Sequence, residues 1–132
     1  MALVFVHNFA KTIKISPARK NKAIVILTAL SLLFNVAAWL ALTIKFKQII
    51  PANSDGIVPL HYNVYLGIDL QGNWWRSLLM PLVGLLFLIF NYLLALALFH
   101  KKNLISYFLI ATNFLLQIII FSASIFTLLL NI

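Results

Sequence analysis

Long apolar runs dominate the pattern of this sequence. Residues 23–44, 78–100 and 104–130 contain no Asp, Glu, Lys or Arg and are apolar at most positions. A helix needs about 20 such residues to cross a hydrocarbon core about 30 Å thick, so each run is long enough. The third is long enough to tilt or to protrude. The pattern predicts an all-α membrane protein with three transmembrane helices.

Positive residues flank these runs unevenly. One side of the predicted membrane collects seven of the ten cations, which are Lys11, Lys14, Arg19, Lys20, Lys22, Lys101 and Lys102. The other side holds the remaining cations and both acids, which are Lys45, Lys47, Arg76, Asp55 and Asp69. Because cytoplasmic segments carry the excess of Lys and Arg, we expect a multi-pass plasma-membrane protein with its N-terminus in the cytoplasm and its C-terminus outside.

The segment before the first run, residues 1–22, has a helical amphipathic pattern that Pro17 ends. Its apolar positions are Leu3, Val6, Phe9, Ala10 and Ile13, and its polar positions are His7, Asn8, Lys11 and Lys14. This is typical of a helix on the inner leaflet, where anionic lipids attract Lys, although a frayed terminus is the alternative. The first run is longer than the core of a secretory signal and no clear cleavage site follows, so we interpret it as a retained anchor.

Residues 45–77 form the predicted outer loop, and apolar and polar residues alternate within it. The apolar or aromatic positions are Val58, Leu60, Tyr62, Val64, Leu66 and Ile68. A period of two predicts an extended strand, preceded by a turn at Ser54, Asp55 and Gly56. Because a lone strand leaves its backbone unpaired, it should fold back as a hairpin, lie on the end of the bundle, or pair with another chain. Trp74 and Trp75 mark the return to the lipid interface.

Pro81 constrains the start of the second helix, because proline lacks an amide donor and clashes with the preceding helical turn. Two arrangements satisfy this constraint. Either residues 73–80 form a short interfacial helix and the span begins near Pro81, or one long helix kinks there. The first arrangement still leaves about 20 residues for the span, and we favour it.

Each predicted span carries one stripe of small or polar residues, since a helix turns by about 100° per residue. The stripes are Thr28, Ser31, Asn35 and Ala38; Ser77, Gly84, Asn91 and Ala95; and Ser106, Asn113, Gln117 and Ser124. Asn35, Asn91, Asn113 and Gln117 lie at similar depth and are expected to form polar contacts between helices. The stripes therefore predict a seam within one chain or between copies; a polar path or ligand site is the functional alternative.

Composition agrees with a membrane protein. The 132 residues have a mean hydropathy of +1.05, and 64% are hydrophobic while 9% are charged, which excludes a soluble domain. The net charge of +8 is explained by topology, so no nucleic acid is expected. With no cysteine, the chain has no disulfides, thiolate metal sites or Cys nucleophiles. Residues 23–132 are expected to form one membrane domain.

Little in the outer loop indicates catalysis. Asp55, His61 and Asp69 match no metal-site spacing, and Ser54 and Ser77 lie in no nucleophile motif. We therefore expect no enzyme, no metal and no cofactor. The polar residues His61, Asn63, Tyr65 and Asp69 are the expected binding residues of the loop, and hydrogen bonds within the loop are the simpler alternative role.

The loop also carries a pattern of spaced residues, which are Pro59, His61, Asn63, Gly67, Asp69, Gly72, Trp75 and Pro81. In these positions the chain resembles a small bacterial membrane domain of unknown function found at the start of SdpI-like immunity proteins. The resemblance covers the first two spans and their loop, with one additional residue between Asn63 and Gly67. It implies that His61, Asn63 and Asp69 have structural or functional positions in the loop, and it implies no reaction.

These observations predict a small non-enzymatic membrane subunit. Its partners are expected to be the lipid bilayer and either further copies of itself or other membrane proteins, reached through the polar helix faces and the outer strand. The alternatives are an immunity or receptor protein that binds an envelope peptide at the outer loop, and an oligomeric channel or transporter component.

Overall fold

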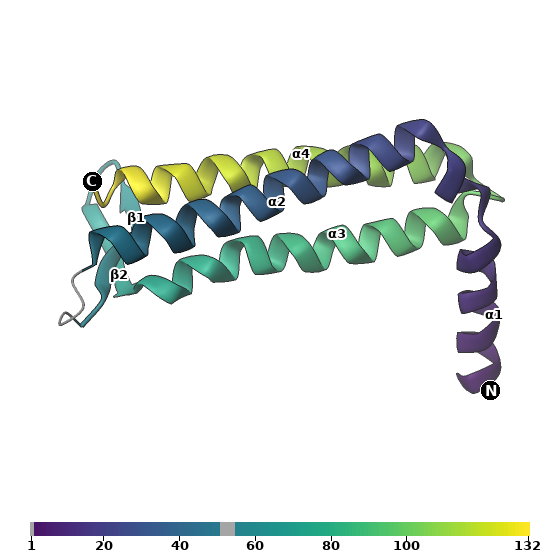
Figure 1. Cartoon of the computed structure of the whole chain (residues 1–132), viewed down its shortest axis with the longest axis horizontal. Helices are drawn as coiled ribbons and strands as arrows, with labels where there is room; N and C mark the ends of the chain where they lie inside the picture. The colour runs from purple at the N-terminus through teal and green to yellow at the C-terminus, as the bar shows by residue number, and fades with distance from the viewer. Residues whose placement is uncertain (1, 51–54) are drawn as a thin grey trace.

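The computed structural model describes residues 2–50 and 55–132 of the chain. Its elements in chain order are α1 (Ala2–Ile15), η1 (Pro17–Lys20), α2 (Lys22–Ile49), β1 (Ile57–Asn63), β2 (Gly67–Asn73), η2 (Trp74–Leu78), α3 (Leu79–Leu98) and α4 (Asn103–Leu129). Helices α2, α3 and α4 lie side by side as an elongated bundle (Figure 1). Helix α1 runs across the bundle axis at one end, and the two strands lie at the other end with the C-terminus.

The three helices of the bundle are long and apolar enough to cross a membrane, which confirms that part of the predicted fold. In an apolar stretch of 18 residues in each helix, only 22–28% of the residues are buried inside the bundle. Leucines such as Leu33, Leu86 and Leu115 are exposed on its outer surface. An apolar surface of this extent is what lipid solvates and water does not.

Helix α2 continues five residues beyond the predicted end at residue 44. The predicted span ends before the first cation, Lys45, but the helix continues because no residue there breaks it. Helix α2 ends at Ile49, since Pro51 disfavours helical geometry in the residue before it, and Ile50 is extended with φ −86° and ψ 117°. The loop predicted from residue 45 therefore begins after Ile49.

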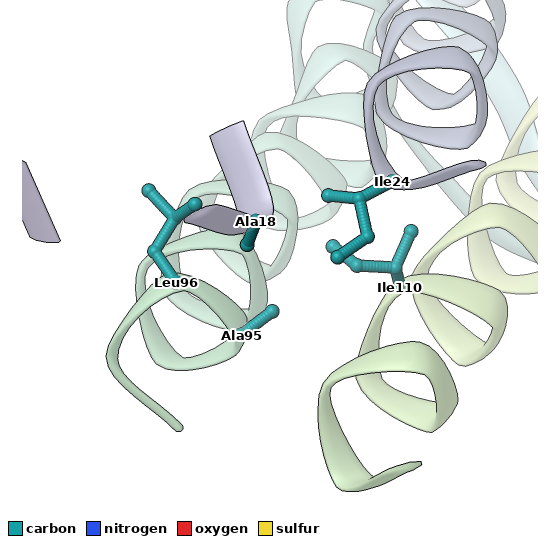
Figure 2. Packing of buried hydrophobic residues seen from close by; sticks show 5 residues of the cluster. All are labelled: Ala18, Ile24, Ala95, Leu96 and Ile110. Atoms are coloured by element: carbon teal, nitrogen blue, oxygen red, sulfur yellow. The ribbon is translucent and has the colours of Figure 1, made fainter. Parts of the chain in front are cut away.

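Helix α1 ends at Ile15, as the position of Pro17 predicts. Ser16 is extended, with φ −60° and ψ 126°, and Pro17 then occupies the first position of η1, where its missing amide leaves no bond unmade. Ala18 of η1 is fully buried against Ala95 and Leu96 of α3, close to Ile24 and Ile110 (Figure 2). This small side chain fixes η1 on the bundle and so directs α1 across its end.

The extended segment is two strands rather than the single strand predicted over residues 58–69. Strands β1 and β2 pair antiparallel in a two-stranded sheet, with a turn at residues 64–66. Of the predicted alternatives, the hairpin is the one found, and it also lies at the end of the bundle. The alternation continues through the turn, so hydrophobic period alone did not locate the break.

Pro81 lies in the first turn of α3, after the short helix η2. Helix η2 is a 3-10 helix that begins at Trp74 and continues directly into α3, so the two arrangements expected from the sequence differ less than the prediction assumed. The first turn of a helix leaves its amides without helical partners, so proline costs little there. The Pro81 carbonyl is also the acceptor of a hydrogen bond from α2, as described below.

Candidate functional site

The hairpin is fixed to the bundle at its base. Gly56 has φ +63°, and its carbonyl accepts a hydrogen bond from the Trp74 amide at 3.0 Å. A Cβ at Gly56 would lie 3.2 Å from Cδ1 of Trp74, so both the conformation and the contact favour glycine. Val58 is buried with Leu42, Phe46 and Leu128. The base of the hairpin is therefore part of the hydrophobic core.

The C-terminal end of α4 holds the hairpin from another side. Nδ2 of Asn131 donates hydrogen bonds to the Pro59 carbonyl at 2.9 Å and to the Thr127 carbonyl at 2.8 Å. One side chain thus joins β1 to the last turn of α4. The sequence alone does not reveal the role of Asn131, because a polar residue at this position gives no local signal of a tertiary contact.

Two bulges shape the middle of the hairpin. Pro59 pairs with Gln71 and His61 with Leu70, so Leu60 is an extra residue in β1. Tyr62 then pairs with Ile68, so Asp69 is an extra residue in β2. Because a bulge redirects side chains, Asp69 faces His61 although the two are not paired in register. Nδ1 of His61 lies 2.7 Å from Oδ1 of Asp69, on the exposed surface of the hairpin.

The turn of the hairpin exposes three large side chains, Val64, Tyr65 and Leu66, which we call the hairpin tip. They are 82%, 95% and 78% exposed. The turn is set by Oδ1 of Asn63, which accepts a hydrogen bond from the Tyr65 amide at 2.9 Å, and by Gly67 with φ +76°. Asn63 thus has a role within the loop, while Tyr65 is almost free of contacts with the chain.

An apolar groove lies under the hairpin, between β1 and the adjacent ends of α3 and α4. Its larger lobe has a volume of about 450 Å³ and its smaller lobe about 380 Å³. Leu60, His61, Met80 and Thr127 line both lobes, so the lobes adjoin. The groove is not predictable from the sequence, because it arises only from the way the hairpin folds over the helices.

Polar side chains link the three helices at the centre of the bundle. Nδ2 of Asn35 donates hydrogen bonds to the Pro81 carbonyl at 2.9 Å and to Oε1 of Gln117 at 3.0 Å. Nε2 of Gln117 donates to the Gly84 carbonyl at 2.8 Å. One residue of α2 therefore bonds both α3 and α4, and Asn35 and Gln117 are each almost fully buried.

Helices α3 and α4 share a regular set of these bonds. Ser106, Asn113 and Gln117 donate to the carbonyls of Ala95, Leu88 and Gly84, at 2.8, 3.4 and 2.8 Å. Each step of seven or four residues along α4 is matched by an equal step back along α3. Three residues of the polar stripe of α4 thus bond to the backbone of α3 within one chain.

Asn91 differs from the other three carboxamides of the expected set. It is half-buried, and its side chain forms no hydrogen bond within the described part of the chain. Asn91 lies about 65° from the middle of the buried face of α3, which consists of Pro81, Gly84, Leu88, Ala95 and Leu96. The spacing of residues predicted that Asn91 belongs to the small and polar stripe, but the face of α3 that packs against the other helices is centred away from Asn91.

The other polar residues considered in the sequence are the possible metal ligands of the outer loop and the two serines near it. Residues 2–50 and 55–132 contain no group of three His, Cys, Asp or Glu side chains that could hold a metal. The hydroxyl of Ser77 is part-buried and donates to the Trp74 carbonyl at 2.6 Å, which fixes η2. Ser54 lies outside the described residues. The features of the outer end that the structure describes are the hairpin tip, the His61–Asp69 pair and the groove.

Comparisons with known proteins add no family or relative. No family model, curated protein or solved structure matches the chain.

Proposed function

We propose that this chain is a small non-enzymatic integral membrane protein of a bacterial plasma membrane, an accessory subunit that binds a partner protein through the hairpin tip. The tip carries the proposal, because Val64, Tyr65 and Leu66 are exposed together at the end of a hairpin whose base is buried. Exposed apolar side chains on a fixed support are typical of binding surfaces, and tyrosine is enriched in them.

The polar helix faces contribute less to association than the sequence suggests. Ser106, Asn113 and Gln117 already bond to α3 of the same chain. Of the four expected carboxamides, Asn91 is the one without a partner among the described residues, so contact through the helices would have to use it. Because these buried polar side chains bond to neighbouring helices of the same chain, they support a subunit over a channel.

The membrane orientation follows from charge. Lys14 belongs to α1, and Lys101 and Lys102 lie in the connection between α3 and α4, which is at the same end of the bundle as α1. The positive-inside rule favours a cytoplasmic position for that end. The crosswise direction of α1 supports its position along the inner leaflet. In this orientation the hairpin faces the extracytoplasmic side, where its partner would be.

A receptor or immunity function, as the resemblance to SdpI-like proteins implies, is the second candidate. The observation that favours it is the direct contact between His61 and Asp69, two residues of the shared pattern. The additional residue of this chain falls in the turn between Asn63 and Gly67, where changes in length are tolerated. An extended peptide could add to the outer edge of β2, which has no strand partner among the described residues.

Substituting Val64→Ser, Tyr65→Ser and Leu66→Ser together tests the subunit function. We expect the partner cross-linked in native membranes to be recovered at least about tenfold less, because a central aromatic anchor contributes about 2 kcal/mol or more to binding. Thermal stability in detergent should not change, since all three side chains are exposed.

The matched control is Ile57→Ser, at an exposed apolar position in the base of the same hairpin. It should leave cross-linking unchanged. If the triple variant keeps every cross-linked species, the tip is not the binding surface. Loss of these species only in a His61→Ala, Asp69→Ala double variant would replace the subunit function by the receptor function.

A further inference from the structure

The groove under the hairpin has a volume and a mainly apolar lining that suit an acyl chain. Its larger lobe runs beside α4 from Ala123 to Leu130, which is a rise of about 10 Å along the helix axis. Leu60, Met80 and Phe126 give this lobe an apolar lining. Its volume of about 450 Å³ lies within the range of small-molecule sites in proteins. The lobe thus follows the bundle axis, along which lipid chains lie.

A single cation lines the smaller lobe. Arg76 reaches it from η2, next to Ser77 and Leu79. The stem of Arg76 packs closely over Gly72, because a Cβ at Gly72 would lie 3.3 Å from Cδ of Arg76. The guanidinium carbon lies 5.9 Å from the ring centre of Trp75. Two neighbours therefore hold this cation at the groove.

The guanidinium of Arg76 has no anionic partner within residues 2–50 and 55–132. The ion pair found there joins His61 to Asp69, and no carbonyl or carboxylate of this part of the chain accepts a hydrogen bond from Arg76. A guanidinium held in place without a partner fits a phosphate, to which it can donate two parallel hydrogen bonds. Trp75 beside it is a residue type that favours the headgroup level of a bilayer.

We infer that this groove binds an anionic phospholipid, with one acyl chain in the larger lobe and the phosphate at Arg76. The apolar lining selects a ligand with a hydrocarbon chain, and the unpaired cation selects one with a negative head. This inference needs the chain to lie in a bilayer, but it does not depend on the hairpin tip or on any partner protein.

Binding of phosphatidylglycerol to the purified full-length protein in detergent tests the inference, with diacylglycerol of the same chains as the ligand that lacks phosphate. We expect phosphatidylglycerol to bind at least about tenfold more tightly, as one charge-assisted contact implies. Arg76→Gln should lower the affinity for phosphatidylglycerol by about the same factor and leave the affinity for diacylglycerol unchanged. Ala123→Leu places a larger side chain in the larger lobe and should lower the affinity for both lipids.

Lys47→Gln is the matched control, because it removes another cation from the hairpin end of the chain outside the groove lining. It should leave both affinities unchanged. Equal weakening by Lys47→Gln and Arg76→Gln would reveal nonspecific charge attraction and overturn the site. Displacement of the lipid by millimolar inorganic phosphate would identify a free-phosphate site instead. If the Arg76→Gln protein has native thermal stability and binds phosphatidylglycerol with full affinity, the proposed lipid site is also overturned.

Discussion

Replacing Gly84 by leucine is expected to force α3 away from α4 and to destabilise the bundle more than any other single change considered. A Cβ at Gly84 would lie 2.5 Å from Cδ1 of Ile120, 3.0 Å from Oε1 of Gln117 and 3.2 Å from Nδ2 of Asn35. Overpacking alone costs about 1–3 kcal/mol, and separating the amides from their acceptors adds about 1–3 kcal/mol. Unfolding by sodium dodecyl sulfate, followed by tryptophan fluorescence, measures the loss.

Gly84→Ala should have an intermediate effect, because the nearest atom is the end of the flexible Ile120 side chain. Val83→Leu is the matched control, since Val83 is the exposed neighbour on the same helix. It should change the free energy of unfolding by no more than about 0.5 kcal/mol. If Gly84→Leu unfolds at the same detergent fraction as Val83→Leu, the close approach of α3 and α4 at this point is wrong.

A double-mutant cycle on Asn35 and Gln117 should give the second largest effects. Asn35→Leu leaves the Pro81 carbonyl and Oε1 of Gln117 without their donor, and Gln117→Leu removes the donor of the Gly84 carbonyl. Each single variant should lose about 1–2 kcal/mol of unfolding free energy. The double variant should lose less than the sum, with a coupling of about 0.6–1.7 kcal/mol, because the two residues share one hydrogen bond.

Asn91→Leu is the natural control for this cycle, since Asn91 is a carboxamide of the same helical bundle that bonds to nothing among the described residues. It should leave stability unchanged or raise it slightly, because a half-buried polar group is replaced by an apolar one. The central hydrogen bonds would not join the helices if the losses of unfolding free energy in the Asn35 and Gln117 variants were additive. The same would follow if Asn91→Leu lost as much unfolding free energy as either of them.

The helices were predictable because length and continuous hydrophobicity are enough to specify them in a membrane protein. Their ends were less so. Helix α2 passes Lys45 and Lys47 and stops before Pro51, because backbone geometry rather than charge ends a helix. Pro81 likewise lies in the first turn of α3, because proline acts on the backbone locally.

The hairpin and the groove depend on contacts that no local pattern contains. Alternation runs unbroken from Val58 to Ile68, and only the Asn63 side chain and Gly67 reveal the turn. The spacing of residues correctly placed Asn35, Asn113 and Gln117 on inward faces, but it also placed Asn91 there. The sequence does not show how wide the buried face of a helix is, because that width depends on the neighbouring helices. The groove exists only where β1 covers α3 and α4.

The central claim is that α2, α3 and α4 cross a membrane with the hairpin outside and the α3–α4 connection in the cytoplasm. Since the chain contains no cysteine, single variants Tyr65→Cys and Lys101→Cys can each be labelled in intact cells with a membrane-impermeant maleimide. We predict that Tyr65→Cys is labelled at once, and that Lys101→Cys is labelled only after the membrane is permeabilised. Labelling of Lys101→Cys in intact cells, with Tyr65→Cys protected, would contradict the account.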